Sequence, residues 1–437
     1  MGEHLNWPER YLTLEEHRLV SNATLCKAAE RLHLDRFINT KGFNGAKWRP
    51  DYLDTTVHDG EAVTREVSSK LLADVVEALI GAAFVDGGQD MAFECLRTLL
   101  PAEHWCPHGD PISRMLTEVP TMECAGMATL EKLVGHEFKR PALLLEAITH
   151  ASFPNNTGLS YERLEFLGDA VLDMIIVPKL FAHSRKMPEW KMHRYHDALV
   201  NGKFLSYCCM AYDLEEQSYD AAPATTANGH INLVESVRTI HLYDFLRCGA
   251  QVSQCRRKAA ELFQQARAVL DDALRTSDEY PWPEIVALEV PKFFSDMVES
   301  VLGAIYLDCE GSLDACETFL ENLGLMKIMQ RMLDEHVEAA YPKEQLGILA
   351  DKKAIKYETS AVKSDDGKMT FTCTVLVDDV LVASVAGRGS KDEAEARAAR
   401  EAARVLLERN GNTKGKLKKR RLGSGAGAEC VTLVCER

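Results

Sequence analysis

The sequence YERLEFLGDAVLDMIIV, Tyr161–Val177, decides the fold because it combines two patterns in one segment. Its apolar residues surround most of a helix, which predicts a helix buried on most sides and ended by Pro178. Its acids recur at steps of three, four and four residues and share one face: Glu162, Glu165, Asp169 and Asp173. Most acidic stripes are solvated. Here no Lys or Arg stands four residues from Glu165 or Asp169, so a divalent cation is the alternative source of neutralising charge.

An internal repeat supplies further carboxylates. The segment KLLADVVEALIGAAFVD, Lys70–Asp86, aligns with KFFSDMVESVLGAIYLD, Lys292–Asp308. Each copy keeps one lysine and two acids: Lys70, Asp74 and Glu77 in the first, and Lys292, Asp296 and Glu299 in the second. A shorter pair, His17–Leu25 and Asp197–Leu205, aligns upstream.

If the helices at Tyr161–Val177 and Lys292–Asp308 cross, four acids converge: Glu165, Asp169, Asp296 and Glu299. Hard oxygen ligands suit Mg²⁺ or Mn²⁺, and a pair of such ions can promote phosphodiester hydrolysis. Lys292 has two interpretations. It can form an ion pair with Asp296 one turn away, or it can meet the scissile phosphate.

The pattern of composition divides the chain into five parts. Residues 1–100 hold the first copy, 101–121 a linker, and 122–330 the second copy with an insertion near 220–257. The pattern of residues 340–410 predicts an α-β-β-β-α unit. Residues 411–437 form a basic tail that includes KGKLKKRR, and we expect this tail to be disordered.

Composition sets further limits. The net charge of −15 argues against a protein that coats phosphates, although not against one that holds them through metal ions and local basic patches. The thirteen cysteines form no CxxC pair, which predicts reduced thiols in the cytosol or nucleus. No apolar run is long enough for a membrane span, and the first residues lack the pattern of a signal peptide.

Three motifs resemble the ribonuclease III family. YERLEFLGDAVL at Tyr161–Leu172 is similar to its signature, THASF at Thr149–Phe153 to the motif before it, and Lys292–Asp308 to its second acidic helix. The tandem copies and the α-β-β-β-α unit together resemble the C-terminal part of fungal Dicer-like proteins. This resemblance implies a mainly α fold in which two all-helical domains pair as an intramolecular pseudo-dimer, followed by a small α+β domain.

The same resemblance implies an endonuclease that hydrolyses double-stranded RNA by a two-metal-ion mechanism, in RNA silencing and antiviral defence. The implied ligands of Mg²⁺, or of Mn²⁺ as its substitute, are Glu165, Asp169, Asp296 and Glu299. Lys292 would act in catalysis, and Glu162 would be a supporting acid outside the inner metal shell.

The first copy departs from the family pattern. It keeps Asp74 and Glu77 as metal ligands and Lys70 as a supporting residue, but the signature Asp would fall before Met1. We therefore expect a chain shortened within its first domain, a first domain short of one core helix, and an impaired first half-site. The second site would then nick one strand.

The segment GRGSKDEAEARAA, Gly387–Ala399, is similar to a double-stranded RNA-binding domain. The resemblance implies RNA contacts by Arg388 and Lys391. The family has three lysines at this helix start, whereas Asp392 and Glu395 occupy two of the positions here. Acids facing phosphates weaken binding, so we expect low RNA affinity and allow a role in protein contact.

Two alternatives to the enzyme stay open. One is a non-catalytic RNA-binding or structural relative, against which the four retained acids argue. The other is an inert product that dimerises, with itself or with an RNA-silencing protein, and the lost first signature favours it.

Overall fold

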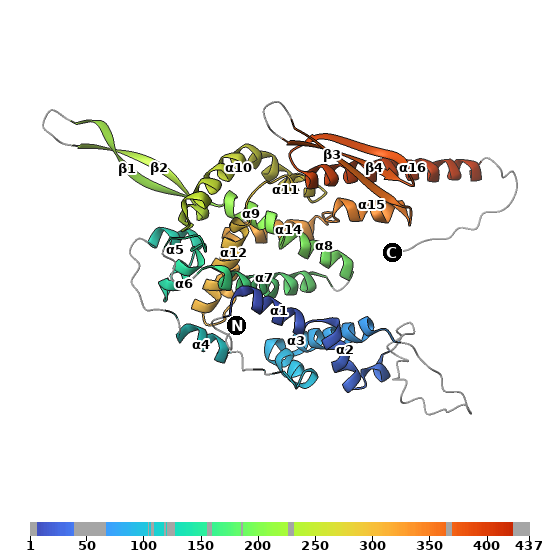
Figure 1. Ribbon diagram of the computed structural model, residues 1–437, viewed down its shortest axis with the longest axis horizontal. Helices are drawn as coiled ribbons and strands as arrows, with labels where there is room; N and C mark the ends of the chain where they lie inside the picture. The colour runs from blue at the N-terminus through green and yellow to red at the C-terminus, as the bar shows by residue number, and fades with distance from the viewer. Residues whose placement is uncertain are drawn as a thin grey trace. The chain divides into compact units, whose positions relative to one another are not determined.

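The computed structural model describes residues 7–38, 67–103, 105, 109–117, 119, 127–154, 160–184, 187–225, 231–363 and 369–422. Only the backbone is described at residues 109–110, 218–225, 231–235, 388 and 410–422. The chain divides into two compact units, Met1–Pro120 and Thr121–Arg437. Figure 1 shows their helices and strands. No described helix has the length and apolarity that a membrane span requires.

The first unit is helical in its described part. It consists of α1 (Glu9–Leu19), α2 (Asn22–Arg31), a short 3-10 turn (Leu34–Phe37), α3 (Ser69–Leu99) and α4 (Gly109–Thr117). The Ser21 hydroxyl starts α2 by accepting a hydrogen bond from the Thr24 N–H at 3.3 Å. The core lies between α2 and α3, where Leu25, Ala29 and Val76 are buried. Gly88, at φ 69°, makes a kink within α3.

The second unit contains a larger helical domain followed by a small α+β domain. The helices of the larger domain are α5 (Ala128–Val134), α6 (Pro141–Ala147), α7 (Glu162–His183), α8 (Glu189–Leu199), α9 (Gly202–Ala211), α10 (Ala250–Thr276), α11 (Trp282–Val286), α12 (Phe293–Asp308), α13 (Asp314–Asn322) and α14 (Leu325–Asp334). At the centre is α12, which packs against α7, α9 and α6 (Figure 1). Every side chain of α12 except Glu299 is buried.

The predicted stop at Pro178 is wrong, because α7 continues through this proline to His183. The proline removes one backbone hydrogen bond, which weakens a helix without always ending it. Leu180 is buried beyond the proline, so tertiary packing holds this last turn in helical form.

The end of α12 is anchored by Asp308, whose side chain is fully buried. Its carboxylate accepts hydrogen bonds from the backbone N–H groups of Lys139 (3.0 Å) and Arg140 (2.9 Å) and lies 2.9 Å from His136 Nε2. Burial would raise the pKa of Asp308, but these hydrogen bonds lower it overall. Asp308 therefore fixes the loop between α5 and α6 to the central helix.

The insertion of the second copy forms a β-hairpin that the sequence pattern did not predict. Strand β1 (Asp213–Thr225) pairs antiparallel with β2 (Ile231–His241), from Asp213 opposite His241 to Thr225 opposite Ile231. Figure 1 shows the ribbon extending away from the helices. A polar ribbon of this kind has weak sequence signals, because neither face is consistently apolar.

The C-terminal domain has the predicted α-β-β-β-α order. It consists of α15 (Pro342–Ala350), β3 (Ile355–Lys363), β4 (Met369–Val377), β5 (Val380–Arg388) and α16 (Lys391–Leu422). The strands form an antiparallel sheet in the order β3-β4-β5. Its core joins Val375 on the sheet to Leu346 on α15 and Ala398 on α16. The mainly α fold with a terminal α+β domain is thus confirmed.

The last helix is longer than predicted. We expected the C-terminal unit to end at residue 410 and the tail to be disordered from residue 411, but α16 continues to Leu422. No proline follows Leu407 to stop the helix. The rest of the predicted tail, 423–437, lies outside the described residues. The described cysteines are free thiols, as expected.

Candidate metal centre

Two glycines set the geometry of the candidate site, because they let α7 and α12 approach backbone to backbone. A Cβ atom on Gly168 would lie 1.7 Å from the Glu299 carbonyl oxygen. A Cβ atom on Gly303 would lie 2.3 Å from the Leu164 carbonyl oxygen. No larger residue fits at either position, so each helix presents its acids directly to the other.

This crossing brings three acids together. Oxygens of Glu165 on α7 and of Asp296 and Glu299 on α12 all lie within 4.8 Å of one another. The predicted fourth acid, Asp169, is one turn further along α7, is exposed, and is not part of this closest group. Its charge nevertheless acts on Glu299. The predicted convergence therefore has an inner set of three acids and one neighbour.

Lys292 places a positive charge between two of these acids. Its Nζ lies 3.1 Å from Asp296 Oδ1 and also donates a hydrogen bond to Glu165 Oε1. Burial would lower the pKa of Lys292, but the hydrogen bond to Glu165 and the charge of Asp296 raise it overall. Lys292 is largely exposed at 74% and can move outward. A cation therefore fits between these carboxylates.

Glu299 shows that the site is short of positive charge. Burial and, after it, the charges of Asp169, Glu165 and Asp296 together raise the pKa of Glu299 to about 8. Lys292 opposes it. Half-buried carboxylates that share one space suit a hard divalent cation, since Mg²⁺ and Mn²⁺ prefer oxygen ligands.

Tyr161 is a site residue that the sequence analysis missed. It is buried, and its hydroxyl donates a hydrogen bond to Asp296 Oδ2 at 3.0 Å. Its position directly before α7 was a possible signal, because a polar atom of a buried tyrosine needs a partner. The predicted supporting acid Glu162 is exposed and accepts a hydrogen bond from Ser160 Oγ at 3.1 Å.

The motif Thr149–Phe153 supports the start of α7. The Tyr161 N–H donates to the Thr149 carbonyl oxygen at 2.9 Å, and Arg247 donates to Thr149 Oγ1 at 2.9 Å. The Arg247 guanidinium also lies over the Phe153 ring, 4.2 Å from its centroid. These contacts position Tyr161, and through it Asp296.

The first copy holds fewer acids. Lys70 Nζ lies 2.9 Å from Asp74 Oδ1 on the surface of α3, and Glu77 is exposed one turn further on. Among the residues that the structure describes, no third metal-ligating side chain joins Asp74 and Glu77.

Of the two predicted RNA contacts in the C-terminal domain, the structure describes the side chain of Lys391 only. Lys391 Nζ lies 3.6 Å from Glu395 Oε1, so part of its charge is compensated within α16. Glu395 also accepts a hydrogen bond from Lys343. Arg388 ends β5, and its side chain lies outside the described residues.

The ribonuclease III domain family matches residues 2–88 and 162–310, and the double-stranded RNA binding motif matches 342–406. The chain therefore belongs to the ribonuclease III domain family.

Within this family the chain is similar to fungal Dicer-like proteins. It is 38% identical to Dicer-like protein 2 of Coccidioides immitis over 415 residues, which is 93% of this chain and 29% of the relative. The same protein of Phaeosphaeria nodorum is also 38% identical, over 94% of this chain and 29% of the relative. The chain thus spans less than a third of the length of these curated relatives.

A solved Dicer from Pichia stipitis aligns over 66% of this chain and 98% of that chain, at 16% identity. Its TM-score is 0.25, too low for a comparison of the two folds.

Proposed function

We propose that the chain is a double-stranded RNA endoribonuclease whose working site is the crossing of α7 and α12. The observation that carries this proposal is the group of Glu165, Asp296 and Glu299, whose oxygens lie within 4.8 Å of one another, with the Lys292 ammonium paired to the first two. Apolar residues would stabilise this helix packing as well as the charged group does, so stability alone does not explain the group.

Glu165, Asp296 and Glu299 would hold Mg²⁺, or Mn²⁺ as its substitute, with Asp169 as the adjoining acid. When bound, the metal would activate water and stabilise the leaving oxygen of an RNA phosphodiester. Tyr161 keeps Asp296 in one orientation through its hydrogen bond. Glu162, which is exposed on the first turn of α7, would support this site from outside the metal ligands.

Lys292 would leave the carboxylates and contact the scissile phosphate. Its ammonium is exposed and joined to Glu165 and Asp296 by contacts that a divalent cation would replace. Once displaced from the carboxylates, the Lys292 ammonium would stabilise the negative charge that develops on the phosphate in the transition state.

The first copy would contribute an impaired half-site built from Lys70, Asp74 and Glu77. Two acids bind a divalent cation less well than four. We propose that the two copies pair within the chain and that the second copy nicks one strand. Arg388 and Lys391 would contact the RNA backbone, which supports binding by shape rather than by sequence. A homodimer or an RNA-silencing protein partner would complete a second cut.

Cleavage of a duplex RNA labelled separately on each strand tests this function. We expect the wild-type chain to cut one strand in Mg²⁺ and the Glu299→Gln variant to lose at least about 100-fold in rate, since even supporting residues of metal sites cost 10–100-fold. The matched Glu77→Gln variant should cut at nearly the wild-type rate. A folded wild-type chain that cuts no RNA in Mg²⁺ or Mn²⁺ would contradict the proposal and favour a non-catalytic RNA-binding role.

A further inference from the structure

The α16 helix carries an arginine face that is directed at the nuclease domain. Arg397 NH1 lies 2.9 Å from Glu284 Oε1 on α11, and Arg400 lies 3.3 Å from Glu279 and 3.5 Å from Glu284. The side chains of Arg397 and Glu284 are only 26% and 19% exposed. Partly buried ion pairs of this kind restrain two elements more than surface pairs do.

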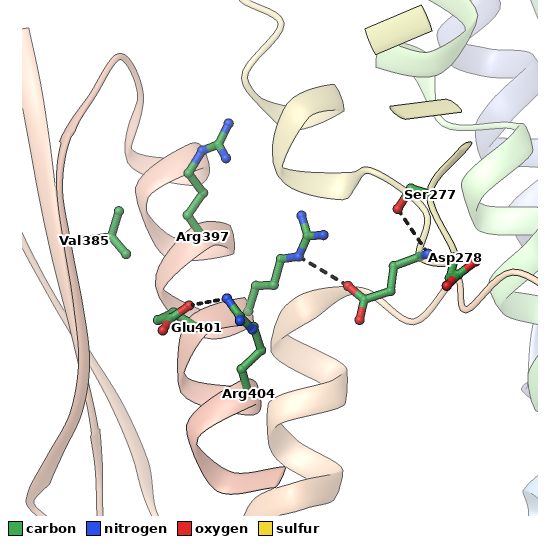
Figure 2. A pocket seen from close by; sticks show the side chains of 8 residues that line it. Ser277, Asp278, Val385, Arg397, Glu401 and Arg404 are labelled. Atoms are coloured by element: carbon green, nitrogen blue, oxygen red, sulfur yellow. Dashed lines mark hydrogen bonds and ion pairs between the residues drawn. The ribbon is translucent and has the colours of Figure 1, made fainter. Parts of the chain in front are cut away.

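The groove beside this face is electrically balanced. Figure 2 shows Arg397 and Arg404 on α16 opposite Ser277 and Asp278, across a space of about 620 Å³. The groove is lined by three arginines and by three acids: Arg397, Arg400, Arg404, Asp278, Glu279 and Glu401. A phosphate backbone would meet no net positive charge here, so the face suits protein contact better than RNA.

The acids at the start of α16 also make contacts within the chain. Glu395 is 8% exposed, and Lys343, Lys391 and the Thr359 hydroxyl all contact it. Glu393 is 9% exposed and pairs with Arg397 at 2.8 Å. The acids thus compensate part of the charge of Lys343 and Lys391 at this helix end, while the Lys391 side chain stays 63% exposed.

The docked helix α11 leads directly into the metal centre. From Val286 the chain runs through Glu289 to Lys292 at the start of α12. A Cβ atom on Gly389, just before α16, would lie 3.2 Å from Glu289 Oε1, so the two segments are in close contact. Lys203 on α9 also donates a hydrogen bond to the Val286 carbonyl oxygen. The segment before Lys292 therefore contacts both α9 and the residues that start α16.

An apolar contact adds to these polar ones. Trp282 on α11 is 5% exposed, and its ring centroid lies 5.2 Å from that of Tyr341, just before α15. Trp282 Nε1 donates to the Ala339 carbonyl oxygen at 2.9 Å. The ion pair of Arg194 with Glu344, at 2.8 Å, joins α8 to α15.

We propose that the double-stranded RNA binding motif of this chain is a docking module, which uses the Arg397 and Arg400 face of α16 to brace α11 and thereby position Lys292 and Asp296. The docking stands on contacts within the second unit. Its consequence for Lys292 and Asp296 rests on the proposed function of the metal centre.

Hydrogen exchange of the full chain tests the docking without any need for nuclease activity. We expect Arg397→Glu to speed exchange of residues 282–292 by roughly fivefold or more. The double variant Arg397→Glu with Glu284→Arg should restore part of the slow exchange, because it rebuilds this pair with reversed charges while Glu393 and Arg400 then face like charges. Unchanged protection of β3–β5 would show that the C-terminal domain stays folded. Glu284→Gln is the second variant, for the case that Arg397→Glu disturbs the fold of the C-terminal domain. It removes the acid without adding a charge, and it should also speed exchange of residues 282–292.

Arg404→Glu is the matched control, since Arg404 is 66% exposed and pairs with Glu401 on its own helix. It should leave exchange of residues 282–292 unchanged. The proposal is overturned if Arg397→Glu and Glu284→Gln both leave this exchange unaltered. A second result also overturns the proposal. In it, Arg397→Glu and Arg404→Glu weaken the binding of a duplex RNA equally, and the double variant with Glu284→Arg restores neither slow exchange nor RNA affinity. That second result would make α16 an RNA-binding face.

Discussion

The helices α3 and α12 share their lysine and two acids but differ in what surrounds them. In α12, Val301, Tyr306 and Leu307 are at most 4% exposed. At the corresponding positions of α3, Leu79 and Phe84 are 40% exposed and Val85 is 63% exposed. Identical acids therefore do not make identical sites. The crossing with α7 is what converts an acidic stripe into a buried cluster.

The glycines express the same contrast. Gly303 has the Leu164 carbonyl oxygen 2.3 Å from where its Cβ would be, whereas its counterpart Gly81 has no atom within 4 Å. In the described part of the first unit, no helix takes the place that α7 has beside α12. The shared lysine is used differently as well. Lys70 contacts Asp74 within one helix, and Lys292 links two helices through Glu165 and Asp296.

The largest effect is expected from alanine at the two corresponding glycines. Gly303→Ala should lower the free energy of unfolding of the second unit by about 3 kcal/mol or more, because the new methyl group overlaps backbone that cannot move far. Gly81→Ala should stabilise α3 by up to about 1 kcal/mol, since alanine favours a helix and meets open space. Denaturant unfolding monitored by hydrogen exchange at each helix compares them. Equal effects would contradict the asymmetry.

A smaller difference is expected at Asp308, the last residue of α12, and at its counterpart Asp86, just before the kink within α3. Asp308→Asn should cost about 2–3 kcal/mol in the free energy of unfolding, because it weakens buried hydrogen bonds to two backbone N–H groups. Asp86→Asn should stay within about 0.5 kcal/mol, since Asp86 is exposed. Thermal unfolding of both variants is the measurement. Loss of stability in Asp86→Asn of the same size as in Asp308→Asn would show that α3 is packed like α12.

The smallest expected effect is a pH dependence confined to the second copy. Because the pKa of Glu299 rises from 4.5 to about 8 in the folded protein, the unfolded chain loses this proton first. In EDTA, the stability of the second unit should therefore fall as pH rises from 4.5 to 8, by roughly 2 kcal/mol for a coupled set of acids. Glu299→Gln should remove this decrease relative to wild type, whereas Glu77→Gln should not. If the stability of Glu299→Gln falls with pH as much as that of the wild type, groups other than Glu299 cause the decrease.

The sequence indicated which acids of α7 and α12 lie together because acids in apolar helices have a clear pattern. It predicted the pairing of Glu165 with Asp296 and Glu299, the two interpretations of Lys292, and the terminal α+β domain. It could not predict the Tyr161 hydrogen bond or the packing at Gly168 and Gly303, because these depend on how two distant segments cross. The hairpin of β1 and β2 was missed because a polar ribbon has weak sequence signals. The continuation of α7 through Pro178 was missed because tertiary packing outweighed the local signal of the proline.

The most direct test of the comparison is the binding of Mn²⁺ to the full chain, measured by electron paramagnetic resonance with Glu299→Ala and Glu77→Ala as matched variants. The packed crossing predicts that Glu299→Ala abolishes the tight binding and that Glu77→Ala leaves it unchanged. Equal loss of Mn²⁺ in the two variants would contradict the account, because the exposed acids of α3 would then bind metal as well as the buried cluster on α12.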